Sequence, residues 1–156
     1  MASKKRPKAG TSRERDTTYW DPNRVSFDKG RPYVEQQLRK ARLDPDAAIM
    51  TSRDPKAIKA KGLLKTLNSP PGFEKWQLPF SFFHPTNFYV TVGKPGSRVP
   101  SHSHDEGAGM RFILDGSITF NGKRLGPGDW VYIPKGMAYR FTVGRRGVTL
   151  LADYAC

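Results

Sequence analysis

From Phe88 onward the chain breaks into short apolar segments separated by turn-forming residues. Each segment is rich in β-branched and aromatic residues, and Asn121-Gly122 is a typical hairpin turn. Many short strands at near-regular spacing predict an antiparallel sandwich or a small barrel. The expected strands are residues 88–92, 98–104, 110–116, 117–125, 129–134, 139–143 and 148–154.

The first half of the chain has a different pattern. Residues 1–18 are Lys, Arg, Ser, Thr and Gly with almost nothing apolar, so we expect a disordered basic tail. Residues 19–87 are expected to hold an extended arm, two helices and an aromatic connector. The first helix is predicted over 31–43 from Pro32 and a repeat of apolar residues.

The second helix is predicted over 54–68. Asp54 is a candidate N-cap, Pro55 suits the first helical position, and Ala60, Leu63 and Leu64 share one apolar face. Lysines occupy much of the remaining surface of this helix. Such a basic helix can bind a membrane or RNA, or it can simply pack on its own domain with its lysines in water.

The net charge is +13, and it is concentrated near the start of the chain. Residues 1–68 carry 17 Lys and Arg against 8 Asp and Glu, so residues 1–65 are candidates for contacting nucleic acid or another polyanion. The alternative is a solvated tail that aids solubility. The first residues lack the apolar core of a secretory signal, and no apolar run is long enough to span a membrane. The single cysteine, Cys156, fits a reducing compartment, so we expect a cytoplasmic protein.

Two of the three histidines, His102 and His104, stand one residue apart in a strand-like segment. Side chains at i and i+2 of a strand point to the same face, so both imidazoles aim at one point. Two ligands of a single metal need this arrangement, and imidazole suits Zn, Fe, Ni or Cu.

The surroundings of the pair form a longer pattern. Gly96, His102, His104 and Gly116 resemble the first motif of the cupin superfamily, and the segment from Gly128-Asp129 through Ile133-Pro134-Lys135-Gly136 to Tyr139 resembles the second. The resemblance implies an all-β cupin fold, a double-stranded β-helix or jelly-roll barrel, over residues 88–156. Residues 1–87 would form an N-terminal helical extension to it.

The resemblance also implies a metal site. The family usually holds its metal with two histidines and a glutamate from the first motif and one histidine from the second. His102 and His104 match, the place of the glutamate falls at Gly109 or Ala108, and Tyr139 replaces the second-motif histidine. We therefore expect a divalent metal ion (Fe, Zn, Mn or Ni) on His102, His104 and Glu106. Weak metal binding, or no metal with the histidines as acid–base groups, are the alternatives.

Alternation along the strands predicts which residues line the barrel interior. Arg111, Tyr139 and Phe141 are expected to face inward, and Tyr132 to close one wall. Arg111, Tyr132 and Phe141 are the candidate substrate-binding residues, while Tyr139 and Glu106 are the candidate catalytic ones. An inward arginine suggests an anionic ligand; an ion pair with a nearby carboxylate would explain it equally well.

Two functions follow as hypotheses. The first is a metal-dependent cupin enzyme (lyase, isomerase, cyclase or dioxygenase) that acts on a small, anionic organic molecule. The second is a non-catalytic ligand-binding or sensor cupin whose basic N-terminal half contacts a polyanionic partner. The resemblance further suggests a homodimer, with Trp76, Phe82 or Phe83 in its interface.

Overall fold

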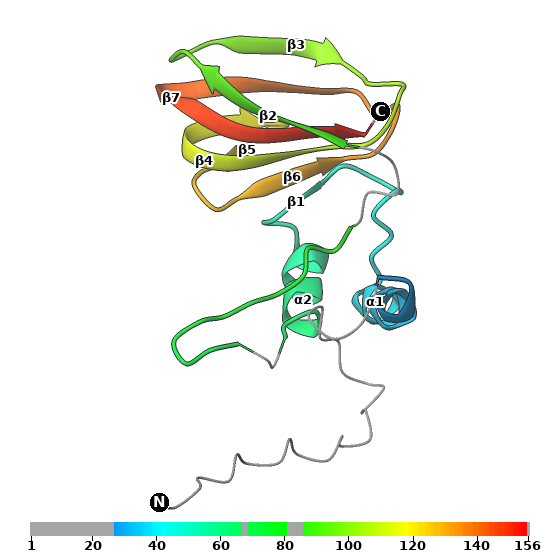
Figure 1. Ribbon diagram of the computed structural model, residues 1–156. Coiled ribbons are helices and arrows are strands. Elements are labelled where there is room, and N and C mark those ends of the chain that lie inside the picture. The colour runs from blue at the N-terminus through cyan, green and yellow to red at the C-terminus, as the bar shows by residue number, and fades with distance from the viewer. Residues whose placement is uncertain (1–26, 67–68, 81–85, 156) are drawn as a thin grey trace, which may run out of the picture.

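The computed structural model describes residues 27–66, 69–80 and 86–155. In these residues two helices lie in the N-terminal half, with the short strand β1 between them, and seven strands make up a single antiparallel sheet (Figure 1). The predicted all-β architecture with an N-terminal helical extension is confirmed. The elements are α1 (Phe27–Ala41), β1 (Met50–Thr51), α2 (Pro55–Leu63), β2 (Thr86–Gly93), β3 (Arg98–His102), β4 (Gly109–Phe120), β5 (Lys123–Leu125), β6 (Trp130–Ile133) and β7 (Tyr139–Ala155).

The two long strands β4 and β7 run antiparallel along their whole length and organise the sheet. Along one half they are flanked in the order β1-β6-β4-β7-β2. Along the other half β5 pairs with β4 and β3 pairs with β7. The pair therefore belongs to both halves, and the sheet folds back on itself into a barrel-like body (Figure 1), which we call the barrel.

The predicted strand ends near residues 116 and 144–147 are bends within continuous strands. The β4–β7 register shifts between Gly116 and Ile118. Gly116 has φ +75°, and a Cβ atom placed on it would lie 2.1 Å from the carbonyl oxygen of Gly147. Only glycine allows the two backbones to approach this closely, so the residue that resembled a strand terminator instead permits a bend.

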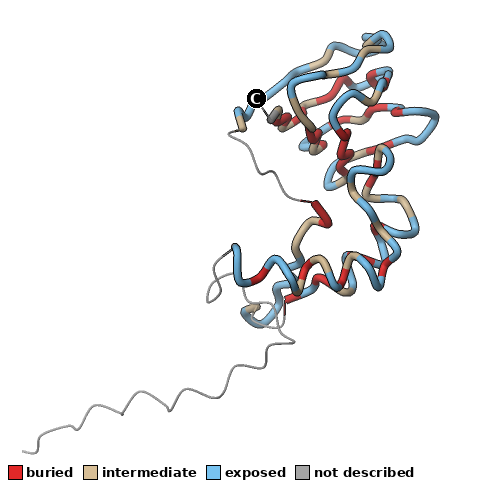
Figure 2. The backbone as a smooth tube through the Cα atoms, turned by 90° about the vertical axis from the view of Figure 1, so that its right-hand side faces the viewer, coloured by how far each residue is buried: buried red, intermediate tan, exposed pale blue. Residues whose placement is uncertain are grey.

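Apolar side chains form separate cores on the two faces of the sheet. The interior is filled by side chains from β4 to β7, among them Ile113, Phe120 and Leu150. On the outer face, Trp130 and Tyr132 of β6 pack against residues from the N-terminal half, including Phe80. Strand β1 pairs with β6, so the N-terminal half supplies part of the sheet itself. Figure 2 shows these buried stretches in the barrel and along the helices.

Both helices form near their predicted positions but with different ends. Helix α1 begins at Phe27, four residues before the predicted start, and Pro32 lies inside it. Helix α2 ends at Leu63 and not at residue 68, because the chain after it turns into an antiparallel bridge between Lys65 and Trp76. The two helices pack on each other through a third apolar cluster.

Asp54 precedes α2 but its carboxylate does not cap the helix. It accepts a hydrogen bond from the backbone N–H of Thr51 (2.7 Å) and forms an ion pair with Lys123. The predicted capping interaction is replaced by contacts that tie the start of the helix to β1 and to β5.

Several other predictions fall on residues that the structure does not describe, or on residues next to them. The basic tail 1–18, Phe82, Phe83 and His84 lie outside the described residues. Trp76 is partly exposed, and the ammonium of Lys61 lies 3.9 Å from the centroid of its ring. The homodimer stays a prediction. None of the helices in the described ranges is long and apolar enough to cross a membrane.

Candidate functional site

The two histidines meet a tyrosine at one end of the barrel. His102 ends β3 and pairs directly with Tyr139, the first residue of β7, after an irregularity in the β3–β7 register beyond Val99. The ring centroids of His102 and Tyr139 are 4.4 Å apart, and those of His102 and His104 are 5.0 Å apart. Both histidines are partly exposed, so solvent reaches the imidazoles.

A hydrogen-bond chain connects an arginine to one of these histidines. The Nη2 group of Arg111 donates to the hydroxyl oxygen of Tyr139 (2.9 Å), and that hydroxyl lies 3.1 Å from Nε2 of His104. A guanidinium can only donate, so the tyrosine oxygen accepts from it. The phenolic proton points to Nε2 of His104 when that nitrogen is unprotonated, and the lowered pKa of His104 favours this neutral form.

Arg111 is buried as predicted, but its contacts are internal. Its side chain is 3% exposed, and Nη1 donates to the backbone oxygens of Met110 (2.9 Å) and Asp153 (3.2 Å). The guanidinium carbon lies 4.2 Å from the ring centroid of Tyr154. These contacts hold Arg111 behind Tyr139 and make it a positioning residue for the phenol.

The surroundings set the protonation states of the site. Burial lowers the pKa of His104, and the nearby Arg111 and His102 lower it further. Burial raises the pKa of Tyr139, although Arg111 partly opposes this. At neutral pH the hydrogen-bond chain from Arg111 to His104 therefore consists of a guanidinium cation, a protonated phenol and a neutral imidazole.

His102 is held by its other ring nitrogen. Nδ1 lies 2.9 Å from the backbone oxygen of Pro100, which can only accept, so Nδ1 carries a proton. In the neutral ring, Nε2 is then a free acceptor. The result is one imidazole with an available lone pair beside a second whose lone pair is taken by Tyr139.

The expected divalent metal would need several suitable side chains around one point. No group of three or more His, Cys, Asp or Glu side chains able to hold a metal ion occurs in the described part of the chain. Glu106 is exposed and does not complete the histidine pair. The lone pair of His104 is engaged, and the Arg111 cation contacts the same hydroxyl. This donor set does not fit a metal held by three protein ligands.

The structure separates the other candidate residues from the pair. Tyr132 lies on the opposite face of the sheet, where its ring stacks on Phe80 (centroids 4.6 Å apart) and its hydroxyl donates to Asp46 (3.1 Å). Tyr132 is therefore not part of the candidate site, because it pairs with Met110 of β4, which belongs to the same outer cluster. Phe141 is in the barrel core and stacks beneath Tyr139.

Two residues of the cluster were not singled out from the sequence. Tyr154 lies beside His104, with ring centroids 4.9 Å apart. Asp153 is 1% exposed, accepts a hydrogen bond from the N–H of Met110 (2.6 Å), and has a pKa raised by burial. Alternation through the last strand could have placed Tyr154 inward opposite Gly109. The burial of Asp153 depends on packing and leaves no local signal.

Comparisons with known proteins give likenesses of fold only. No protein-family model matches this sequence, and no curated protein matches it. Among solved structures, it is similar to a cupin-like protein of unknown function from Ralstonia eutropha JMP134 (18% identity, TM-score 0.42), covering 47% of this chain and 49% of the other. It is also similar to the Cnp3 cupin domain of Schizosaccharomyces pombe (21% identity, TM-score 0.41; 49% and 56% covered).

A third similar structure is the Rhodobacter sphaeroides complex of SigE with the anti-sigma ChrR (20% identity, TM-score 0.41; 47% and 40% covered). The chain thus spans roughly half of each of these proteins. Such partial superpositions do not define a function. The strand order is that of a single antiparallel sheet, in agreement with the all-β barrel that the two sequence motifs imply.

Proposed function

We propose that the protein performs acid–base chemistry on a small, anionic organic molecule at the end of the barrel, without a resident metal. The observation that carries this proposal is the hydrogen-bond chain from Arg111 through Tyr139 to His104. It places a phenol that accepts from a cation against the partly exposed imidazole of His104, beside the free nitrogen of His102.

The roles of the residues follow from their protonation states. His102 is the candidate general base, because its Nε2 lone pair is unoccupied and its ring is held by Pro100. Tyr139 is the candidate proton donor to an oxygen that gains negative charge during the reaction, and that oxygen would have to replace Nε2 of His104 as the acceptor of the phenolic proton. Arg111 supports that charge from behind. Proton transfer of this kind suits an isomerase or lyase among the predicted reaction types.

The metal-dependent reading remains the competing prediction. One observation favours it: a backbone carbonyl on Nδ1 of His102 orients Nε2 in the way that metal-binding imidazoles are commonly oriented. In that reading His102, His104 and Glu106 would hold the divalent ion, although the last of these is exposed.

The test follows the histidine ring resonances by NMR while small carboxylic acids and sugar acids are added, with and without a chelator. We expect shifts at His102 and His104 on ligand addition that the chelator leaves unchanged. The variant Tyr139→Phe should weaken the response of His104. Stoichiometric Fe, Zn, Mn or Ni in elemental analysis, with ligand shifts that vanish on chelation, would overturn the metal-free proposal.

Catalysis and simple binding are separated by the fate of the ligand. An enzyme converts an added acid into product, which NMR detects directly, and His102→Gln abolishes the conversion. Binding without any conversion would support the non-catalytic sensor alternative.

A further inference from the structure

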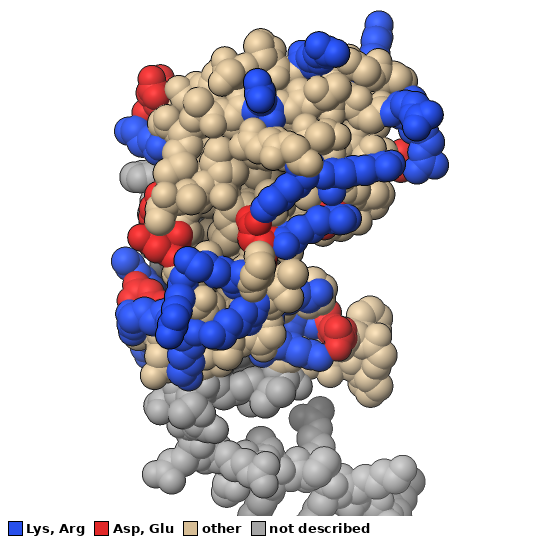
Figure 3. Space-filling view, turned by 180° about the vertical axis from the view of Figure 1, so that it is seen from behind, with Lys and Arg blue, Asp and Glu red and all other residues tan. Residues whose placement is uncertain are grey.

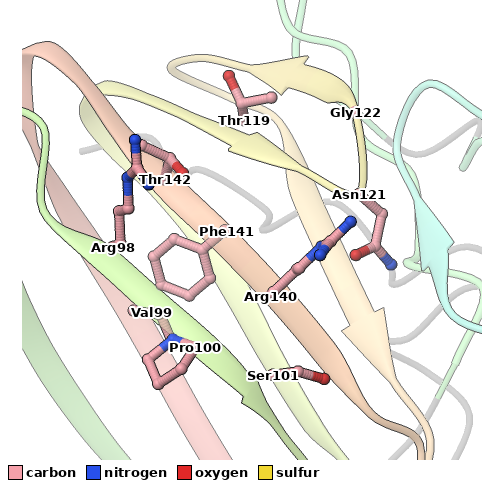
Figure 4. Close-up of a pocket in the computed structure, with 10 residues that line it drawn as sticks. All are labelled: Arg98, Val99, Pro100, Ser101, Thr119, Asn121, Gly122, Arg140, Phe141 and Thr142. Atoms are coloured by element: carbon pink, nitrogen blue, oxygen red, sulfur yellow. The ribbon is translucent and has the colours of Figure 1, made fainter.

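The outer face of the barrel carries a hollow of mixed polar and apolar lining, and none of the cluster residues His102, His104 and Tyr139 is among its lining residues. The hollow has a volume of about 570 Å³ and is lined by residues of β3, β4 and β7 and of the β4–β5 turn. Its polar lining includes Arg98, Thr119, Asn121, Arg140 and Thr142 (Figure 4). None of its lining residues is acidic.

Strand pairing brings these residues onto one face. Thr142 pairs with Arg98 on one side and with Thr119 on the other, and Thr119 pairs in turn with Arg124. Directly paired residues of a sheet point to the same side, so two arginines flank two threonines along a single row across four strands. All four residues are exposed.

A third arginine completes the face. Arg140 stands two residues before Thr142 and therefore points to the same side of β7. In Figure 4 its guanidinium extends toward Asn121, whose backbone N–H bonds to the carbonyl of Arg140 (3.5 Å). Neither Arg98 nor Arg140 makes a side-chain hydrogen bond or ion pair with another described residue.

The charge around the hollow has a single sign. Residues 94–104, 116–128 and 136–152 contain no Asp or Glu, whereas they contain seven Lys or Arg. Of these, Lys123 is paired with Asp54 of the N-terminal half. Elsewhere on the molecule both signs occur, as over the helices, where Lys and Arg side chains gather beside acidic ones (Figure 3). The residues that line the hollow therefore carry only positive charge, and Asp54 is already paired with Lys123.

We infer that this basic face binds the phosphodiester backbone of a nucleic acid. Arginine, threonine and asparagine are residue types that commonly donate hydrogen bonds to phosphate oxygens, and the extended row matches an extended polyanion better than a compact one. The one aromatic side chain among its lining residues, Phe141, is 9% exposed and packs in the barrel core, so the face offers little surface on which bases could stack. Binding should therefore show little dependence on base sequence.

The experiment uses the full-length chain and a fluorescein-labelled oligonucleotide of about 20 nucleotides, single-stranded in one arm and duplex in the other. Fluorescence anisotropy gives the affinity between about 50 and 200 mM salt. The test variant is Arg98→Gln/Arg140→Gln. The matched control is Lys56→Gln/Lys59→Gln, which removes the same charge from exposed positions on α2. Thermal unfolding of each variant confirms that it is folded.

We expect the test variant to lose at least about tenfold in affinity, and its slope of log affinity against log salt to fall by about 1.4 for single strands or 1.8 for duplex. The control variant should change both quantities by less. The arm with the larger loss identifies the form of nucleic acid that binds. Equal losses in both variants would overturn the inference, because net charge alone would then explain the binding. Equal binding of polyglutamate, lost in the same variant, would overturn the choice of nucleic acid.

Discussion

Tyr139 and Arg140 are neighbours in the chain, yet they serve two different surfaces. Tyr139 points into the barrel and belongs to the histidine cluster, whereas Arg140 points outward and lines the basic hollow. The same division separates Arg111, which is 3% exposed, from Arg98, which is exposed. Residue type alone therefore does not decide the role of an arginine in this protein; the face of the strand decides it.

The difference lies in how each guanidinium is satisfied. The guanidinium of Arg111 is buried, and its contacts with water are replaced by contacts with two backbone oxygens, a phenol oxygen and an aromatic ring. The outer arginines keep their water and are free to exchange it for a ligand. A buried cation of this kind fixes the geometry of a site, while an exposed one attracts a partner.

The largest expected effect is the loss of stability when the buried arginine of this comparison is replaced. Arg111→Ala should lower the free energy of unfolding by about 3–5 kcal/mol, because it leaves buried polar groups without their cation. Arg140→Ala should change it by less than about 0.5 kcal/mol. Urea unfolding followed by circular dichroism measures both. Similar losses in the two variants would contradict the division between the faces.

The second prediction concerns the bend that lets β4 and β7 belong to both halves of the sheet. Gly116→Ala should cost about 1–3 kcal/mol more than Gly122→Ala. Both glycines have positive φ (+75° and +81°), but only at Gly116 would the new Cβ meet backbone. The matched pair isolates the close approach from the backbone strain, and equal costs would show that the two strands do not cross tightly there.

A smaller loss of stability is expected when the hydrogen bonds of the histidine cluster are removed. Tyr139→Phe removes the hydroxyl between Arg111 and His104 and should lower the free energy of unfolding by about 1–2 kcal/mol. Tyr89→Phe, on the exposed strand β2, is the control and should leave it unchanged. If the two substitutions were equivalent, the hydrogen-bond chain would contribute nothing to the fold.

The smallest effect is a dependence on pH. The pKa of His104 lies below its ordinary value of 6.5 in the folded protein, so the unfolded chain binds more protons just below that pH. Its contribution to stability is complete above pH 6.5 and declines as the pH falls through the folded pKa. NMR titration of His104 should therefore give a midpoint below 6.5. His104→Gln should lose part of the drop in stability between about pH 8 and pH 5. A midpoint above 6.5 would refute the neutral imidazole.

Much of this arrangement was predictable because side chains alternate between the two faces of a strand. Parity placed Arg111 and Tyr139 inward together, and the i, i+2 spacing brought His102 and His104 to one point. The turn at Asn121-Gly122 was also readable, since both residues adopt the positive φ that such a turn requires.

Other features depend on contacts distant in sequence. The sequence pattern predicts the end of a strand at Gly116, because a glycine in isolation does not reveal whether a chain stops or bends. The pattern places Tyr132 in the pocket, but its orientation depends on the β4–β6 register, which pairs it with Met110 and so turns it outward. The spacing predicts His104 as a metal ligand, although the hydroxyl of Tyr139, 35 residues away, lies 3.1 Å from its Nε2.

The sequence by itself determined the fold class, the inward face of the long strands and the positions of the two imidazoles, since these follow from periodicity over a few residues. Only the tertiary structure decided that Arg111 supports a phenol, that no carboxylate completes the histidine pair among the described residues, and that Arg98 and Arg140 share one outer face. Each of these depends on which strands become neighbours, and hydrogen bonds between strands act only after the sheet has set their register.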